Sequence, residues 1–218
     1  IRDHAESRGL GDVYKRQVNE NITDWVTEEG NPFEVQENYF SLATGYSGVF
    51  NQMDYLATEF DGLSGEEVDG NGTFWFSKND TESGYGNVEF TITPKKSGNA
   101  YLYVTSPDIE SIEVNGGSLS AHTQTIGEPY ILDIGYCDEG EEITVNLDCS
   151  NIETTDTYAE VYAYTVDNDV LSKGYEKLKN SSLNVEKHSD TKIIGTIETE
   201  ENSVLYSSIP YDLSLIHI

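Results

Sequence analysis

The stretch Gly86–Asp148 decides the fold of this chain, because it contains five short runs of strongly β-forming residues. These runs are Asn87–Thr93 (NVEFTIT), Ala100–Thr105 (AYLYVT), Ile109–Asn115 (IESIEVN), Tyr130–Tyr136 (YILDIGY) and Glu142–Asp148 (EITVNLD). Between them lie short segments rich in Pro, Gly, Ser and Asp, which favour turns. Short strands at this spacing are typical of an antiparallel β-sandwich or jelly roll. We therefore expect a mainly β, galactose-binding-like sandwich.

Apolar and polar residues alternate along most of these runs. In the first, Val88, Phe90 and Ile92 alternate with acidic and Thr residues, so one face of the strand is expected to be buried and the other wet. Ala100–Thr105 is apolar on both faces and is predicted to be a central strand. Tyr158–Thr165 is predicted to close the sandwich. Either Val161 and Ala163 face the core and Tyr162 and Tyr164 face outward, or the reverse.

The rest of the chain is divided around this sandwich. We expect a lead-in over residues 17–72, the sandwich over 73–166, a linker helix over 167–182 and the start of a second β module over 183–212. In the lead-in, Asn31 and Pro32 are a favourable N-cap and first helical residue, which predicts a helix near 32–44. Phe50–Glu59 is compatible with a strand or an irregular crossing, and Asp61–Gly72 is expected to be a loop of Gly and acidic residues.

The two ends of the chain differ in character from its middle. All three Arg residues lie within the first 16 positions, and the end of the chain becomes abruptly apolar after Asp212. Residues 12–17 and 213–218 resemble translated sequencing-adapter sequence. We therefore expect residues 1–16 and 213–218 to be non-native or disordered tails that take no part in the fold.

The charge of the chain restricts its partners. Its 12 Lys and Arg against 40 Asp and Glu give a formal net charge of −28. This charge argues against nucleic acid and anionic lipid as partners, because both carry phosphates. Divalent cations or neutral sugars would suit it. No run of about 18 apolar residues occurs, so no segment is expected to span a membrane.

The two cysteines are predicted to be free. Cys137 and Cys149 flank a turn at Asp138–Gly140. If the flanking strands pair as a hairpin, strand geometry separates the two Cα atoms by more than about 20 Å. A disulfide requires a separation of about 4.4–6.8 Å. We therefore expect two partly buried thiols.

Motifs that would carry metal or nucleophile chemistry are weak, and we expect no cofactor. His122 and His188 lack a second ligand at zinc spacing. Gly45–Gly48 departs from the spacing of a nucleophile elbow and is interpreted as a turn. Asp69 and Asn71 offer alternating oxygen donors but lack the remainder of a calcium loop, so a turn is favoured over weak calcium binding.

Sugar binding is the more promising chemistry. Trp75, Tyr85 and Tyr46 lie near predicted loops, where an aromatic ring can stack on a sugar, although core packing of these side chains is the simpler interpretation. A glycosidase would need two facing carboxyl groups roughly 5–10 Å apart. The acidic pairs Glu66–Glu67 and Glu141–Glu142 are interpreted as solvated loop charges, and paired catalytic carboxylates elsewhere stay open.

Several segments resemble one family in order and spacing. They are Asn31–Asn38, Leu42–Gly45, Gly86–Thr93, Ala100–Ser106, Ile112–Gly116 and Ser207–Asp212. Together they resemble the extracytoplasmic β domain of the bacterial YfhO membrane-protein family, over about Asn31 to Asp212. The resemblance implies a parent with many transmembrane helices and a glycosyltransferase-like membrane region, which modifies cell-surface polymers from a lipid-phosphate-linked sugar donor.

The resemblance also implies where the chemistry lies. Catalytic acidic residues of such enzymes belong to loops of the membrane region, so no catalytic residue is assigned in this chain. We expect a non-catalytic domain on the extracytoplasmic face of the bacterial cell membrane, with its own transmembrane region and a cell-surface glycan as partners. The alternative is a free-standing carbohydrate-binding module of a secreted glycan-active protein.

Overall fold

The computed structural model describes most of the chain and divides it into two compact units. The described residues are 15–27, 30–68, 70, 72–79, 85–109, 111–115, 117–118, 131–150, 152, 156–180, 182–189, 192–198 and 203–207. The sandwich unit comprises Glu29–Val35 and Gly48–Asn168. The terminal unit comprises Ile1–Glu28, Gln36–Ser47 and Asp169–Ile218.

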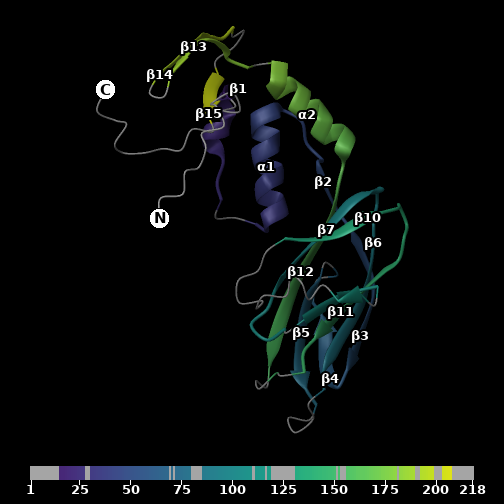
Figure 1. Ribbon diagram of the computed structural model, residues 1–218. Helices are drawn as coiled ribbons and strands as arrows, with labels where there is room; N and C mark the ends of the chain where they lie inside the picture. Colours follow the sequence, from purple (N-terminus) through teal and green to yellow (C-terminus); the bar gives the residue numbers. More distant parts are fainter. Residues whose placement is uncertain are drawn as a thin grey trace, which may run out of the picture. The chain divides into compact units, whose positions relative to one another are not determined.

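The sandwich unit consists of two antiparallel sheets in two layers (Figure 1). Sheet 1 has the strand order β10 (Leu132–Cys137), β7 (Gly98–Thr105), β12 (Thr157–Val166), β5 (Thr73–Lys78) and β4 (Leu63–Glu67), and β2 (Phe50–Gln52) also pairs with β12. Sheet 2 has the order β3 (Asp54–Asp61), β6 (Asn87–Thr93), β11 (Ile143–Asp148), β8 (Ser111–Val114) and β9 (Gly117–Ser118). The fold is an antiparallel β-sandwich of the galactose-binding-like jelly-roll type.

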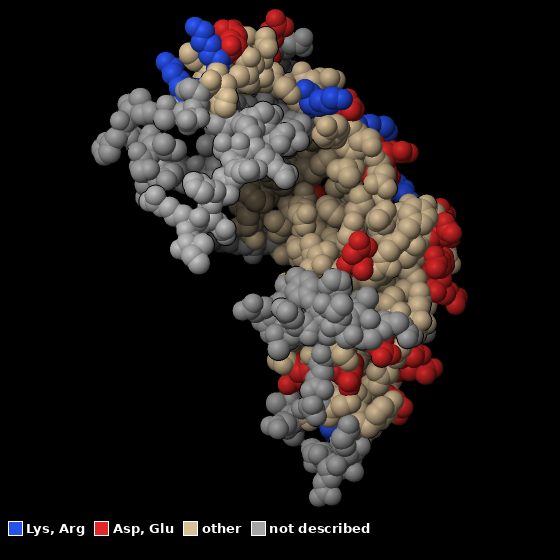
Figure 2. Space-filling view, viewed as in Figure 1, with Lys and Arg blue, Asp and Glu red and all other residues tan. Residues whose placement is uncertain are grey.

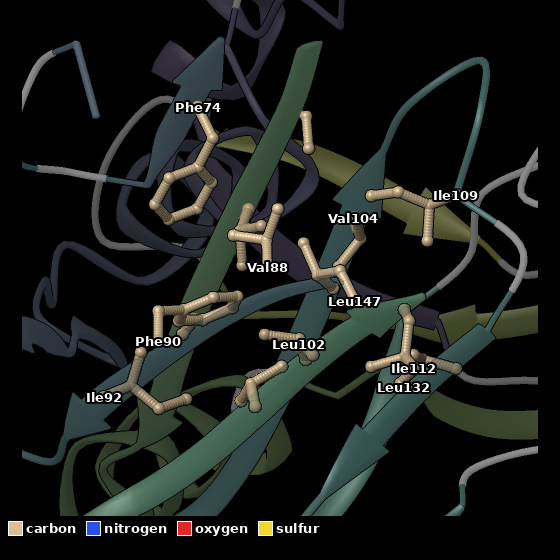
Figure 3. Close-up of a cluster of buried hydrophobic side chains, with 14 of the residues drawn as sticks. Phe74, Val88, Phe90, Ile92, Leu102, Val104, Ile109, Ile112, Leu132 and Leu147 are labelled. Carbon is tan, nitrogen blue, oxygen red and sulfur yellow. The ribbon is translucent and has the colours of Figure 1, made fainter. Parts of the chain in front are cut away.

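Alternating apolar side chains from both sheets fill the space between them. Figure 3 shows Phe74, Leu102 and Val104 of sheet 1 with side chains of sheet 2, among them Phe90 and Leu147. All five residues are buried, and the Phe74 and Phe90 rings stack with centroids 5.2 Å apart. Each such side chain contributes roughly 1.5–3 kcal/mol by leaving water. The alternation predicted for Asn87–Thr93 is confirmed, since its Val, Phe and Ile are buried and its other residues are only partly buried.

Most strand positions in the sandwich unit agree with the sequence. Ala100–Thr105 lies in β7, which is an interior strand as expected. The loop expected over Asp61–Gly72 is wrong, because Leu63–Glu67 forms β4 and pairs with β5. β4 is an edge strand in which only Leu63 is buried, so it lacks the alternation of a strand that is covered on one face. The sandwich therefore includes β2, β3 and β4 from the segment that the sequence assigns to the lead-in.

The hairpin assumed between the two cysteines is also wrong. β10 pairs with β7 in sheet 1, whereas β11 pairs with β6 and β8 in sheet 2, so the turn after Cys137 crosses from one sheet to the other. Hydrophobic alternation identifies the buried face of a strand but not its partner. The expectation of free thiols is confirmed, since Cys137 and Cys149 are both free and buried.

Helix α1 (Pro32–Thr44) begins where the sequence predicts. The Asn31 side-chain oxygen accepts hydrogen bonds from the backbone N–H groups of Phe33 and Glu34, at 3.0 and 3.2 Å. The Glu34 carboxylate in turn accepts the backbone N–H of Asn31 at 3.2 Å, which completes a capping box. Phe33, in the first turn, is buried and stacks on Tyr164 of β12 with ring centroids 4.6 Å apart.

The terminal unit contains the rest of α1, helix α2 (Asn168–Asn180), two short strand pairs and a 3-10 helix. β1 (Lys15–Asn19) pairs with β15 (Ser203–Ser207), β13 (Asn184–Ser189) pairs with β14 (Lys192–Thr196), and Glu20–Asp24 forms a 3-10 helix. β1 includes Lys15 and Arg16 and has no counterpart among the predicted strands. Gly174 of α2 lies against the Phe40 ring, so the two helices approach closely. None of the described helices is long and apolar enough to cross a membrane.

Candidate functional site

The outer face of sheet 1 carries a row of aromatic side chains. Register places Tyr158 opposite Trp75 and Tyr162 opposite Tyr103, with ring centroids 5.5 and 6.2 Å apart. We call these four residues the aromatic face. Trp75 is 49% exposed and Tyr158 is 39% exposed, so their rings are accessible and outside the core.

Polar groups border the aromatic face. Glu160 lies between the two Tyr residues of β12, and its Oε2 accepts a hydrogen bond of 3.1 Å from Thr105 Oγ1. Glu66 of β4 lies opposite Trp75 in register and is exposed. At the other end of β12, the stack of Phe33 on Tyr164 covers that ring, so the accessible part of the row ends there.

This arrangement suits a sugar ring. A pyranose has an apolar C–H face and a rim of hydroxyl groups. Exposed Trp and Tyr rings offer a flat apolar surface at a low cost in conformational entropy, and the neighbouring carboxylates can accept hydrogen bonds from hydroxyl groups. The sequence offers Trp75 as a candidate for stacking on a sugar, beside the simpler interpretation of core packing. It does not indicate Tyr158, because the position of Tyr158 next to Trp75 follows from the pairing of β5 with β12.

Tyr85 lies at a different place in the sandwich unit. It lines a groove of about 350 Å³ on the outer face of sheet 2, together with polar residues of β6, β8 and β11. Its hydroxyl donates to Asp61 Oδ2 at 3.0 Å, and this hydrogen bond is the main reason that its pKa is raised. Tyr85 and Trp75 are therefore on the outer faces of opposite sheets.

The remaining candidate residues from the sequence are not placed at the aromatic face or at the groove that Tyr85 lines. Tyr46 follows α1 in the terminal unit, where the Lys177 ammonium lies 5.8 Å from its ring centroid. The calcium candidates Asp69 and Asn71, and also His122, lie outside the described residues. No group of three or more His, Cys, Asp or Glu residues within the described part of the chain could hold a metal ion.

The surface of the sandwich unit is acidic. Figure 2 shows Asp and Glu spread over its visible face, whereas Lys gathers on the terminal unit. In sequence, the segment Gly48–Asn168 contains Lys78, Lys95 and Lys96 and no Arg. This surface would repel polyanionic ligands and leaves neutral molecules unaffected.

The fold and its exposed aromatic row define an acidic antiparallel jelly-roll domain. The chain belongs to the bacterial membrane protein YfhO family, whose sequence profile matches residues 15–214. This match confirms the resemblance to the YfhO family that the sequence shows. No curated protein matches the chain.

Solved structures show weak similarity to the chain. A family 35 carbohydrate-binding module from Clostridium thermocellum is 12% identical, with a TM-score of 0.32, and the match covers 55% of this chain and all of that module. A mutant of a family 29 carbohydrate-binding module is 9% identical, with a TM-score of 0.30, over 72% of this chain and 95% of that one. The insecticidal crystal protein Cry2Aa is 18% identical, with a TM-score of 0.29, over 50% of this chain and 20% of that one.

Proposed function

We propose that this chain is a non-catalytic, glycan-binding domain on the extracytoplasmic face of a YfhO-type membrane protein, which takes part in glycosylation of cell-surface polymers. Sugar transfer would be carried out by the membrane region of that protein, from a lipid-linked donor. The domain would hold the acceptor glycan near the membrane region. Membership of the YfhO family supports the membrane context.

The aromatic face is the observation that carries the glycan-binding part of the proposal. Trp75 and Tyr158 present two accessible rings 5.5 Å apart on a rigid sheet. Strand pairing fixes the backbone positions of both residues and their rings lie against each other, which reduces the conformational entropy that is lost when a ligand binds. The acidic surface favours neutral over phosphate-bearing glycans as ligands.

Calorimetric titration of the purified chain with neutral cell-wall glycans tests this binding. Trp75→Ala is expected to weaken binding by roughly tenfold, which corresponds to about 1.4 kcal/mol. Trp75→Phe retains an aromatic ring and is expected to restore most of the affinity. Trp25→Ala, which removes the other Trp of the chain, serves as the control and should bind as the wild type does. If Trp75→Ala binds with unchanged affinity, Trp75 is not part of the binding site.

The location is tested separately in cells that express the full-length parent. An epitope inserted at the Asp138–Gly140 turn, which is exposed, should be labelled by antibody on intact cells. A parent carrying Trp75→Ala should reach the membrane in normal amount and modify the surface polymer less. Labelling only after the membrane is permeabilised would contradict the extracytoplasmic location.

A further inference from the structure

The groove on the outer face of sheet 2 is separate from the aromatic face. Its lining includes Tyr85, Asn87, Ser111, Glu113, Asn146 and Asp148. We propose that this groove is a second carbohydrate site, which binds one neutral sugar unit through its vicinal hydroxyl groups. The inference deepens the proposed function and rests on it, since both assume a glycan ligand.

Sheet register brings the polar residues of the groove together. Asp148 of β11 lies opposite Asn87 of β6 on one side and Ser111 of β8 on the other. Asn146 lies opposite Glu113 in the same way. Because alternate residues of a strand face the same side, these five side chains share the outer face, while Leu147 between them is buried.

A pair of amides forms the centre of the groove. Asn87 Nδ2 donates to Asn146 Oδ1 at 2.9 Å, which fixes the two side chains against each other. The bond leaves the Asn146 amino group as a donor and the Asn87 Oδ1 as an acceptor, and neither makes another hydrogen bond within the described part of the chain. A sugar hydroxyl both donates and accepts, so two adjacent hydroxyl groups match this donor and acceptor.

Asp148 and Tyr85 are also held in place. Asp148 Oδ1 accepts the backbone N–H and the hydroxyl of Ser150, at 3.0 and 2.5 Å, and Asp148 Oδ2 accepts the Ser111 hydroxyl at 3.4 Å. The bond from the Tyr85 hydroxyl to Asp61 fixes the position of this half-exposed ring at the rim of the groove. The groove therefore offers an oriented carboxylate and an aromatic wall beside the amide pair, which are the groups that protein sites use to fix a small polar ligand.

Size and charge select the kind of sugar. The volume of about 350 Å³ is at the lower end of the range for small-ligand pockets. Among the described lining residues, Glu113 and Asp148 are carboxylates and none is Lys or Arg. An acidic sugar or a phosphate group would be repelled there. A neutral hexose or N-acetylhexosamine unit fits these conditions.

The test is an NMR titration of the full 218-residue chain, read at the side-chain amide signals of Asn87 and Asn146. The probes are the methyl glycosides of glucose, galactose, mannose and N-acetylglucosamine, with glucuronic acid as the anionic comparison and calcium chloride as the cation comparison. At least one neutral probe should shift both amide signals saturably, and glucuronic acid should shift them at least fivefold more weakly.

Variants then assign the effect to the groove. Asn146→Ala and Tyr85→Ala should each weaken binding of the neutral probe at least tenfold. Thr144→Ala is the matched control, since Thr144 lies two residues from Asn146 on the same face of β11 and outside the groove lining; it should bind within twofold of the wild type. Circular dichroism melting curves of all three variants serve to distinguish a loss of fold from a loss of binding.

The possible results separate this inference from the proposed function. If neutral glycans bind and depend on Trp75 while the groove variants bind normally, the groove site is wrong and the proposed function stands. If the groove binds sugars but Trp75→Ala has no effect on any glycan, the role of the aromatic face is wrong. Saturable shifts with calcium but not with sugars would overturn the inference in favour of a cation site. Equal binding of glucuronic acid would overturn the selection for neutral sugars.

Discussion

Replacing Phe74 by Ala tests the two-layer core most sharply, because the next residue of the same strand provides its control. Phe74 is fully buried and stacks on Phe90 of the opposite sheet, with ring centroids 5.2 Å apart. Removing a buried Phe side chain costs about 3–5 kcal/mol, through lost burial and the cavity left behind. Domains are stable by only about 5–15 kcal/mol in total, so a large share of the stability would be lost.

The measurement is urea unfolding of the purified chain, followed by circular dichroism. With a urea dependence of about 2 kcal/mol per molar, Phe74→Ala should lower the midpoint by about 2 M. Trp75→Ala removes an even larger side chain, but one that is half-exposed on the outer face, and should cost no more than about 1 kcal/mol. If Trp75→Ala destabilised the chain as much as Phe74→Ala does, β5 would not face the core as described.

Three further predictions concern a helix cap, a close backbone contact and a buried thiol. Asn31→Ala removes the acceptor for the first N–H groups of α1 and should lower the free energy of unfolding by about 0.5–2 kcal/mol. Asn31→Asp keeps an acceptor oxygen and should lower it much less. Equal losses in the two variants would contradict the capping role. In Gly98→Ala, the new Cβ would lie 2.5 Å from the Val166 carbonyl oxygen, so the melting temperature should fall by several degrees; an unchanged value would contradict the close β7–β12 contact. Burial raises the pKa of Cys149 from its ordinary value of 9.0 to about 12. The folded state therefore holds this proton more tightly than the unfolded state, and the free energy of unfolding should fall as pH rises from about 9 to 12. Cys149→Ala should make the free energy of unfolding depend less on pH in this range. An unchanged slope in the variant would contradict the raised pKa.

The sequence predicts the strands well, because alternation reports directly on burial. The strand predicted over Asn87–Thr93 has the same bounds in the structure, since three of its side chains enter the core and the others do not. β4 is not predicted, because its sequence lacks this alternation. It is an edge strand with one buried residue, and Gly65 lies in its middle against the Phe60 ring, so its sequence looks like a loop.

Strand partners were harder to predict than strand positions. The turn at Asp138–Gly140 is clear in the sequence, but no local signal shows that β10 and β11 belong to different sheets. The free thiols of Cys137 and Cys149 were therefore predicted correctly from a wrong pairing. Tyr164 illustrates a similar limit, since it points away from the core yet is buried, because Phe33 of a distant segment covers it.

For the candidate sites, the sequence indicates single residues but not which residues lie side by side. The sequence indicates Trp75 as an aromatic residue of a short strand that could stack on a sugar. Its neighbour Tyr158 is more than 80 positions away in sequence, and only the β5–β12 register brings the two rings together. The amide pair in the groove of sheet 2 likewise joins positions 87 and 146, which have nothing in common as motifs.

The most direct measurement uses the fact that the chain has only two Trp residues, Trp25 and Trp75. Their indole N–H groups give two separate NMR signals, one from the terminal unit and one from the aromatic face. On titration with neutral cell-wall glycan, the Trp75 signal should shift saturably while the Trp25 signal stays in place. If the Trp75 signal does not move up to the highest glycan concentration that stays in solution, glycan binding at the aromatic face is contradicted. Two Trp signals that move alike would also contradict it.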